Sequence, residues 1–108
     1  EDVLDETVFK LLELLKEGDK KIILVSGRDE ICRWQTEDWL ERHKIQYEAL
    51  FMRPTLNNEK DSIVKERIFR ENIENKYNIL FVLDDRLQVV EKWRELGLKT
   101  LQVAEGYF

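Results

Sequence analysis

The sequence has almost no cysteine or histidine, with one cysteine (Cys32) and one histidine (His43) in 108 residues. This scarcity excludes an internal disulfide, a Cys/His zinc site and a histidine-based catalytic triad. Such low cysteine usage fits the reducing cytoplasm, where we expect the protein to reside. The sequence also lacks any run that approaches the roughly 20 apolar residues needed to cross a bilayer, so we expect no membrane partner.

No excess of positive charge is present. The formal net charge is -5, and charged residues of both signs, 38% of the chain, are interspersed. The overall charge therefore gives no attraction to nucleic acid or to anionic membranes, and a phosphate-binding site would have to be local. The chain contains 43% apolar residues, which is enough to form one hydrophobic core. We therefore expect a single domain over residues 1–108. Because Glu1 replaces a starting methionine and a helical pattern follows at once, we expect this domain to be N-terminally incomplete.

Helical and strand patterns alternate along the chain. Apolar spacing of three and four residues predicts helices, and short β-branched runs without alternation predict buried strands. The expected helices cover residues 4–15, 29–43, 59–76 and a segment around 89–96 that stops at Gly97, and the expected strands cover 22–25, 47–52, 79–83 and 100–103. This order predicts an α/β fold, a parallel sheet with helices on both faces.

In open α/β sheets, ligands bind at the carboxyl ends of the strands. The run Ser26-Gly27-Arg28 follows the first predicted strand and is therefore a candidate site. A hydroxyl, a glycine that permits close backbone approach and a guanidinium together suit a phosphate. The alternative is structural, because Ser26 and Asp29 have the spacing of a capping box.

Asp84 and Asp85 follow the predicted strand that ends at Leu83. Adjacent carboxylates suit Mg²⁺, which takes few protein ligands and completes its shell with water and substrate phosphate. The alternative is that Asp85 caps the next helix together with Gln88. Capping would explain one aspartate but not the pair, so we favour a metal site.

Lys65 is expected to point inward, because at roughly 100° per residue it projects between Ile68 and Phe69 on the apolar face of its helix. A buried ammonium needs a charged partner, and Asp61 lies one turn earlier. The alternatives are a purely structural Asp61–Lys65 pair or a lysine that extends outward to solvent. Arg53 either clamps a phosphate or is a solvated loop residue.

Several runs, taken in order, resemble the phosphatase domain of phage-type polynucleotide kinase/phosphatase, a member of the haloacid-dehalogenase (HAD) superfamily. The resemblance covers about residues 22–108. It is carried by Val25-Ser26-Gly27-Arg28, Arg53, Asp61 with Val64-Lys65-Glu66-Arg67-Ile68-Phe69, the run from Leu83-Asp84-Asp85-Arg86 to Trp93-Arg94, and Gln102-Val103-Ala104-Glu105-Gly106-Tyr107-Phe108.

The resemblance implies a Rossmann-like HAD fold and a role for each matched residue. Ser26, beside Gly27 and Arg28, would contact phosphate, and Arg53 falls at the position of a functional arginine. Lys65 would balance charge around nucleophile and phosphate, with Asp61 as the acidic residue near it. Asp84 and Asp85 would be the acidic pair, at least one of them bound to Mg²⁺.

One family motif is missing. In the family a first strand is followed by Asp-x-Asp-Gly-Thr, whose first aspartate is the nucleophile and whose second is the general acid/base. No such motif occurs in the sequence, and Asp2 and Asp5 lie in a helical segment with no strand before them. The nucleophile strand is therefore expected to be absent from this chain, through truncation or through natural loss.

The leading expectation is a Mg²⁺-dependent phosphatase that hydrolyses 3′-phosphates at nucleic acid ends through an aspartyl-phosphate, with a kinase domain preceding it in the parent protein. Two rivals stay open. One is a HAD phosphatase for a small metabolite, and the other is a catalytically inactive module that binds nucleic acid ends or proteins.

Overall fold

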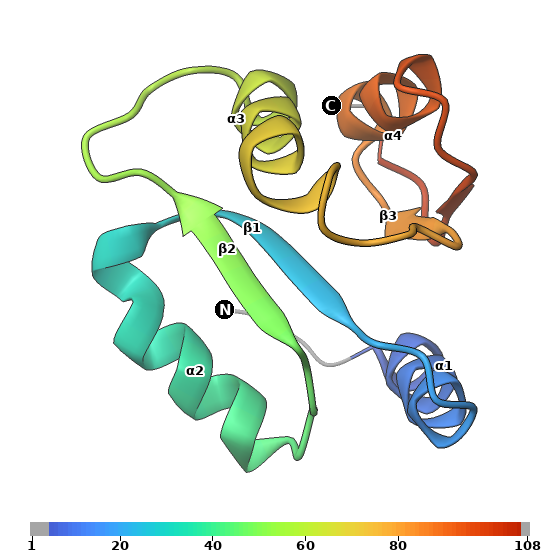
Figure 1. Ribbon diagram of the computed structural model, residues 1–108. Helices are drawn as coiled ribbons and strands as arrows, with labels where there is room; N and C mark the ends of the chain where they lie inside the picture. Colours follow the sequence, from blue (N-terminus) through green and yellow to red (C-terminus); the bar gives the residue numbers. More distant parts are fainter. Residues whose placement is uncertain (1–4, 107–108) are drawn as a thin grey trace. The chain divides into compact units, whose positions relative to one another are not determined.

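The computed structural model describes residues 5–106, so Asp2 and the expected helix start at Leu4 lie outside the described residues. The chain divides into two compact units, Glu1–Asn57 and Asn58–Phe108. Each unit contains one pair of parallel strands joined through a helix, as Figure 1 shows. The predicted α/β class with parallel strands is therefore confirmed. No helix within residues 5–106 is both long and apolar enough to span a membrane.

The first unit begins with helix α1 (Glu6–Glu17). The Asp5 carboxylate starts this helix by accepting hydrogen bonds from the backbone N–H groups of Thr7 and Val8, at 3.0 and 3.1 Å. The helix ends at Gly18, whose own N–H donates to the carbonyls of the last turn. The other elements are β1 (Ile23–Asp29), the short 3₁₀ turn η1 (Glu30–Cys32), α2 (Arg33–Arg42) and β2 (Ala49–Arg53).

Strands β1 and β2 pair in parallel, from Ile23 opposite Ala49 to Ser26 opposite Met52. The register then shifts before Asp29 pairs with Arg53. Helix α2 connects the two strands and lies beside them (Figure 1). The buried core here consists of Leu40, Leu50 and Met52, with Leu24, Cys32, Trp39, Ile45 and Tyr47 packed around it. The alternating buried positions of β2 follow from the two-residue period of a strand.

The second unit contains α3 (Asp61–Ile68), a π-helical turn η2 (Phe69–Ile73), β3 (Val82–Asp84), α4 (Leu87–Glu95) and β4 (Thr100–Gln102). The predicted helix over residues 59–76 is thus shorter at both ends. The predicted buried strand over 79–83 is wrong in its bounds, because only Val82–Asp84 pair and Leu80 is 62% exposed. An apolar run predicts a strand but not its ends. Which residues pair also depends on the partner strand β4, which has only three residues.

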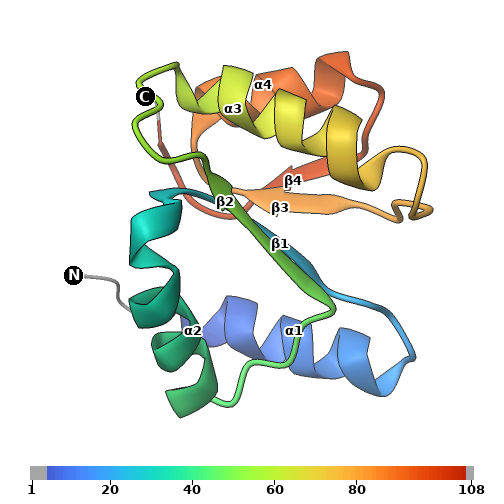
Figure 2. The same ribbon diagram turned by 60° about the vertical axis from the view of Figure 1, so that its left-hand side comes forward.

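Helices α3 and α4 lie side by side on the same side of the β3–β4 pair (Figure 2). Seven buried apolar side chains come from α3, η2 and α4: Val64, Ile68, Phe69, Ile73, Val89, Val90 and Trp93. Trp93 meets Phe69 edge to face, with ring centroids 6.1 Å apart. Gly97 stops α4 with a φ of +87°, a conformation that glycine adopts without steric cost.

The sheet itself differs from the single sheet that alternation predicts. Within residues 5–106 the strands form two separate pairs, β1–β2 and β3–β4. Within each pair, the two strands are consecutive along the chain and are connected through one helix. The alternation of helices and strands does not determine whether two strand pairs belong to one sheet.

Substituting Val90 by Ala should destabilise the protein by about 2 kcal/mol, because Val90 is 0% exposed and the lost methyl groups leave a cavity in the core of the second unit. Urea denaturation followed by circular dichroism measures the change. Val103, which is 38% exposed, is the matched control, and its replacement by Ala should have a clearly smaller effect. Equal losses from the two variants would contradict the buried placement of Val90.

Candidate active site

Ser26, Gly27 and Arg28 lie within β1, because the extended backbone continues through Asp29 instead of ending at Ser26. The Ser26 hydroxyl oxygen accepts a hydrogen bond from the Arg28 N–H at 3.1 Å. The predicted capping-box alternative is wrong, because the residue that caps the following turn is Asp29, which accepts the Ile31 N–H at 2.9 Å. The Arg28 side chain is exposed. The segment is therefore extended backbone with a local hydrogen bond from the Arg28 N–H to the Ser26 hydroxyl, and it carries the exposed Arg28 side chain.

The Asp29 carboxylate also holds the loop that follows β2. Its second oxygen accepts the N–H of Leu56 at 3.3 Å, and Leu56 has a left-handed φ of 65°. The hydrogen bond from Ile31 is the main cause that lowers the pKa of Asp29 below its usual value. A lowered pKa stabilises the folded chain above the unfolded pKa, and this contribution is lost as the pH falls through the folded value.

Arg53 ends β2 and is half-buried, so it is not a solvated loop side chain. Its Nε donates to the Gly27 carbonyl at 2.7 Å. Its Nη1 donates to the side-chain and backbone oxygens of Asn57, at 3.2 and 3.3 Å. Arg53 therefore fixes the backbone of the Ser26–Arg28 segment and ties it to the loop after β2. The first unit thus brings Ser26, Gly27, Arg28 and Arg53 together.

In the second unit, Lys65 points inward, as its helical periodicity predicts. Its side chain is 11% exposed, and its ammonium lies 3.3 Å from Asp61 Oδ2 and 3.5 Å from Asp84 Oδ2. The outward-extending alternative is therefore wrong. The Asp61–Lys65 pair exists, but the ammonium also reaches the end of β3, so the pair is not isolated. Lys65 therefore joins α3 to the last residue of β3.

Asp84 is surrounded by hydrogen-bond donors. Its Oδ1 accepts from the N–H groups of Asp85 and Arg86, at 2.9 and 3.3 Å. Its Oδ2 accepts from Trp93 Nε1 at 3.1 Å and lies beside the Lys65 ammonium. A carboxylate offers about four lone-pair positions, so the acceptor capacity of Asp84 is filled by the protein itself.

Asp85 is exposed and differs from its neighbour. Among residues 5–106, no hydrogen bond or ion pair involves its carboxylate. The capping alternative is wrong here, because α4 begins after Arg86 and has no side-chain cap among the described residues. The Asp84 side chain satisfies the Asp85 and Arg86 N–H groups instead. The two adjacent aspartates therefore have different surroundings, one saturated and one open.

Sequence reasoning missed two members of this cluster, Arg86 and Trp93. Arg86 Nη1 lies 3.3 Å from Asp61 Oδ2, so it shares that carboxylate with Lys65. Trp93 follows Asp84 by nine residues and is buried, with 4% of its surface exposed. The indole N–H that reaches Asp84 was not foreseen, because apolar periodicity gives the direction of a ring but not the partner of its one donor.

The charge of the cluster favours a cation beside Asp85. Asp61 and Asp84 pair with Lys65 and Arg86. The Asp85 carboxylate, next in the sequence, adds one negative charge at an exposed position. No group of three potential metal ligands occurs within residues 5–106. Mg²⁺ needs only one or two carboxylates beside water and substrate phosphate, so an open carboxylate oxygen fits it.

Comparison with known proteins gives the family. The polynucleotide kinase PNKP phosphatase domain family matches residues 1–108 of this chain. A putative bifunctional polynucleotide kinase/RNA ligase of Autographa californica nuclear polyhedrosis virus is 39% identical over 84 residues, which cover 77% of this chain and 12% of the viral protein.

Two solved structures of the Pnkp1/Rnl/Hen1 complex, one described as an RNA repair complex, contain a chain 43% identical to this one. Their TM-scores are 0.96 and 0.97, with all of this chain matched to 35% and 38% of those chains. The matched residues thus span about an eighth of the viral relative and about a third of the structural ones. The match of fold and sequence over the whole chain shows that the protein belongs to the family of polynucleotide kinase phosphatase domains.

Proposed function

We propose that this chain is the supporting part of a Mg²⁺-dependent polynucleotide 3′-phosphatase, which hydrolyses the terminal phosphomonoester of nucleic acid through an aspartyl-phosphate. One observation carries the proposal: an inward lysine and a saturated aspartate lie beside an open, exposed aspartate at the end of a parallel strand. Phosphoryl transfer depends mainly on positioning and on neutralising charge, and this arrangement suits both.

In the first unit, Ser26 and Arg28 would bind the phosphate oxygens. The Arg28 side chain is exposed, and its guanidinium can form two parallel hydrogen bonds to phosphate. The Ser26 hydroxyl lies 3.1 Å from the Arg28 backbone N–H. Arg53 fixes the Gly27 carbonyl, so its contribution would be to hold the shape of this phosphate-binding segment. A preformed shape reduces the reorganisation needed when substrate binds.

In the second unit, Lys65 would neutralise negative charge around the phosphate, and Asp61 would hold its ammonium in place. Asp85 would be the direct ligand of Mg²⁺, because the acceptor positions of Asp84 are already filled. When bound, Mg²⁺ supplies charge stabilisation to the phosphoryl oxygens.

The nucleophile is proposed to come from outside these 108 residues, since no Asp-x-Asp-Gly-Thr motif occurs in them. The much greater length of the relatives supports this proposal. The relatives' names also support a kinase domain in the same protein and RNA ends as substrate. A cytoplasmic location stays a proposal. An inactive end-binding module is the second candidate, favoured by the missing motif.

The test is phosphate release from a 3′-phosphorylated oligonucleotide by the protein extended upstream of Glu1, with Mg²⁺ present. A small phosphomonoester and the 5′-phosphorylated oligonucleotide are the controls. We expect release from the 3′-phosphate alone. Equal release from the small ester would favour a metabolite phosphatase, whereas binding of the oligonucleotide without release would favour the inactive module.

A further inference from the structure

The Trp93 side chain has a buried ring and an indole N–H that donates a hydrogen bond to Asp84. Its ring is 4% exposed and packs edge to face against Phe69, so neighbouring side chains hold it in one orientation. An indole has one N–H and no acceptor, and here that N–H donates to Asp84 Oδ2 at 3.1 Å. A phenylalanine would fill most of the same space without this bond. Packing alone therefore does not account for a tryptophan at this position.

The rest of the Asp84–Asp85 turn is held by its backbone. The N–H of Val103 donates to the Asp84 carbonyl at 3.1 Å, and Gln102 Nε2 donates to the Asp85 carbonyl at 3.0 Å. The Asp84 carboxylate in turn accepts the next two N–H groups of the turn. The direction in which Asp85 leaves the turn therefore depends on how firmly the Asp84 side chain is held.

We infer that Trp93 is a positioning residue of the cation site. The Trp93 N–H occupies the acceptor position of Asp84 Oδ2 that Lys65 does not fill, so Asp84 cannot bind the cation. The same hydrogen bond fixes the turn that presents Asp85. This inference rests on the proposed function, because it takes Asp85 as the cation ligand. Partners that orient a metal ligand commonly affect metal affinity although they do not touch the metal.

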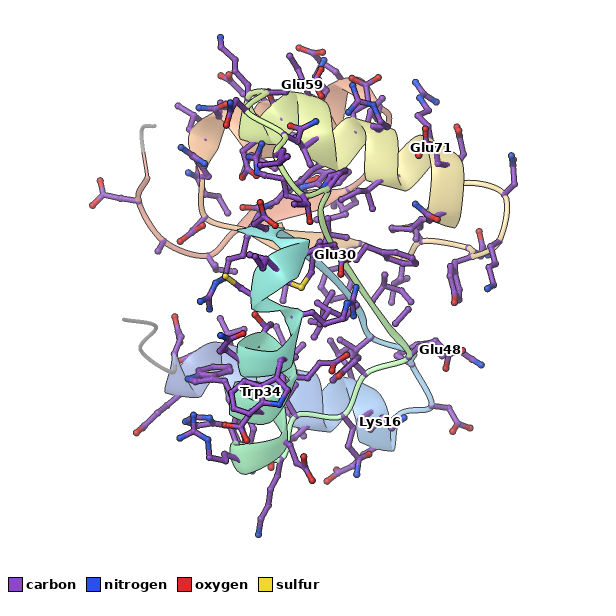
Figure 3. The ribbon with its side chains drawn as sticks, turned by 90° about the vertical axis from the view of Figure 1, so that its left-hand side faces the viewer. Lys16, Glu30, Trp34, Glu48, Glu59 and Glu71 are labelled. Carbon is purple, nitrogen blue, oxygen red and sulfur yellow. The ribbon has the colours of Figure 1, made fainter. Side chains whose placement is uncertain are left out.

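The experiment replaces Trp93 by Phe and measures Mn²⁺ binding to the folded protein by electron paramagnetic resonance, with Mn²⁺ as the probe for Mg²⁺. We expect the Trp93→Phe variant to bind Mn²⁺ about 10-fold more weakly or worse. Two variants are matched controls. Val90→Ala lowers stability in the same core, and Trp34→Phe removes an indole that is 71% exposed on α2 (Figure 3). Neither should change the Mn²⁺ affinity.

The outcomes separate the inference from the proposed function. A Trp93→Phe variant that is less stable but binds Mn²⁺ as tightly as the wild type would show a merely structural residue and overturn the inference alone. A wild type without Mn²⁺ binding would contradict the cation role of Asp85 and the inference together. Weakening by Trp93→Phe that is less than additive with Asp84→Asn would support action through Asp84.

A measurement on the unaltered protein gives the answer even if the variant fails to fold. The three indole N–H signals, from Trp34, Trp39 and Trp93, are followed by nitrogen-15 NMR during a Mg²⁺ titration. We expect the Trp93 signal to move with Mg²⁺, because its acceptor belongs to the turn that binds the cation. The Trp34 signal should stay in place, and a Trp93 signal as insensitive as that of Trp34 would overturn the inference.

Discussion

Replacing Asp85 by Asn is expected to reduce phosphate release from a 3′-phosphorylated oligonucleotide by a factor of about 100 or more. The exposed Asp85 carboxylate is the open ligand of the proposed Mg²⁺ site, and a neutral amide binds a hard divalent cation far more weakly. The measurement is steady-state release by the protein extended upstream of Glu1, at saturating Mg²⁺.

The same substitution should leave the melting temperature nearly unchanged, because the Asp85 carboxylate makes no hydrogen bond or ion pair within residues 5–106. Glu91→Gln is the matched control, since Glu91 is an exposed acid on the nearby helix α4. Release by Glu91→Gln should equal that of the unaltered protein. An Asp85→Asn protein that stays fully active with Mg²⁺ would refute the assignment.

Replacing Lys65 by Met is expected to cost about 3 kcal/mol of unfolding free energy. Lys65 neutralises Asp61 and Asp84, whose side chains are only 6% and 11% exposed, and removing it leaves buried carboxylates less compensated. The loss should lie at the lower end of the range for broken buried pairs, because Arg86 still faces Asp61 and Trp93 still donates to Asp84. Urea denaturation measures it.

Lys92→Met is the control for this stability prediction. Lys92 also contacts two carboxylates, Glu66 and Glu95, but those acids are more exposed and need less compensation. Its replacement should change the unfolding free energy clearly less than Lys65→Met. If the two variants lose the same stability, burial of the Lys65 cluster is not what makes its ion pairs matter.

Lys65, strand β3 and the Asp84–Asp85 pair show which features of the site could be predicted from the sequence. The helical period of 3.6 residues was enough to predict that the Lys65 side chain points inward, and the structure confirms that direction. The bounds of β3 were not predictable, because an apolar run does not show how long its partner strand is. The different surroundings of Asp84 and Asp85 were likewise hidden, although the pair itself stands out in the sequence.

The sequence by itself determined the alternation of helices and parallel strands and the family, because these depend on local periodicity and on motifs of neighbouring residues. It also pointed to candidate site residues, but not to Arg86 and Trp93. Only the tertiary structure decided which donors surround each carboxylate. Trp93 on α4 donates to Asp84, nine residues earlier, and Arg53 on β2 donates to Gly27 on β1. Such hydrogen bonds join residues distant in the sequence, and their existence depends on packing that brings a donor within about 3 Å of its acceptor.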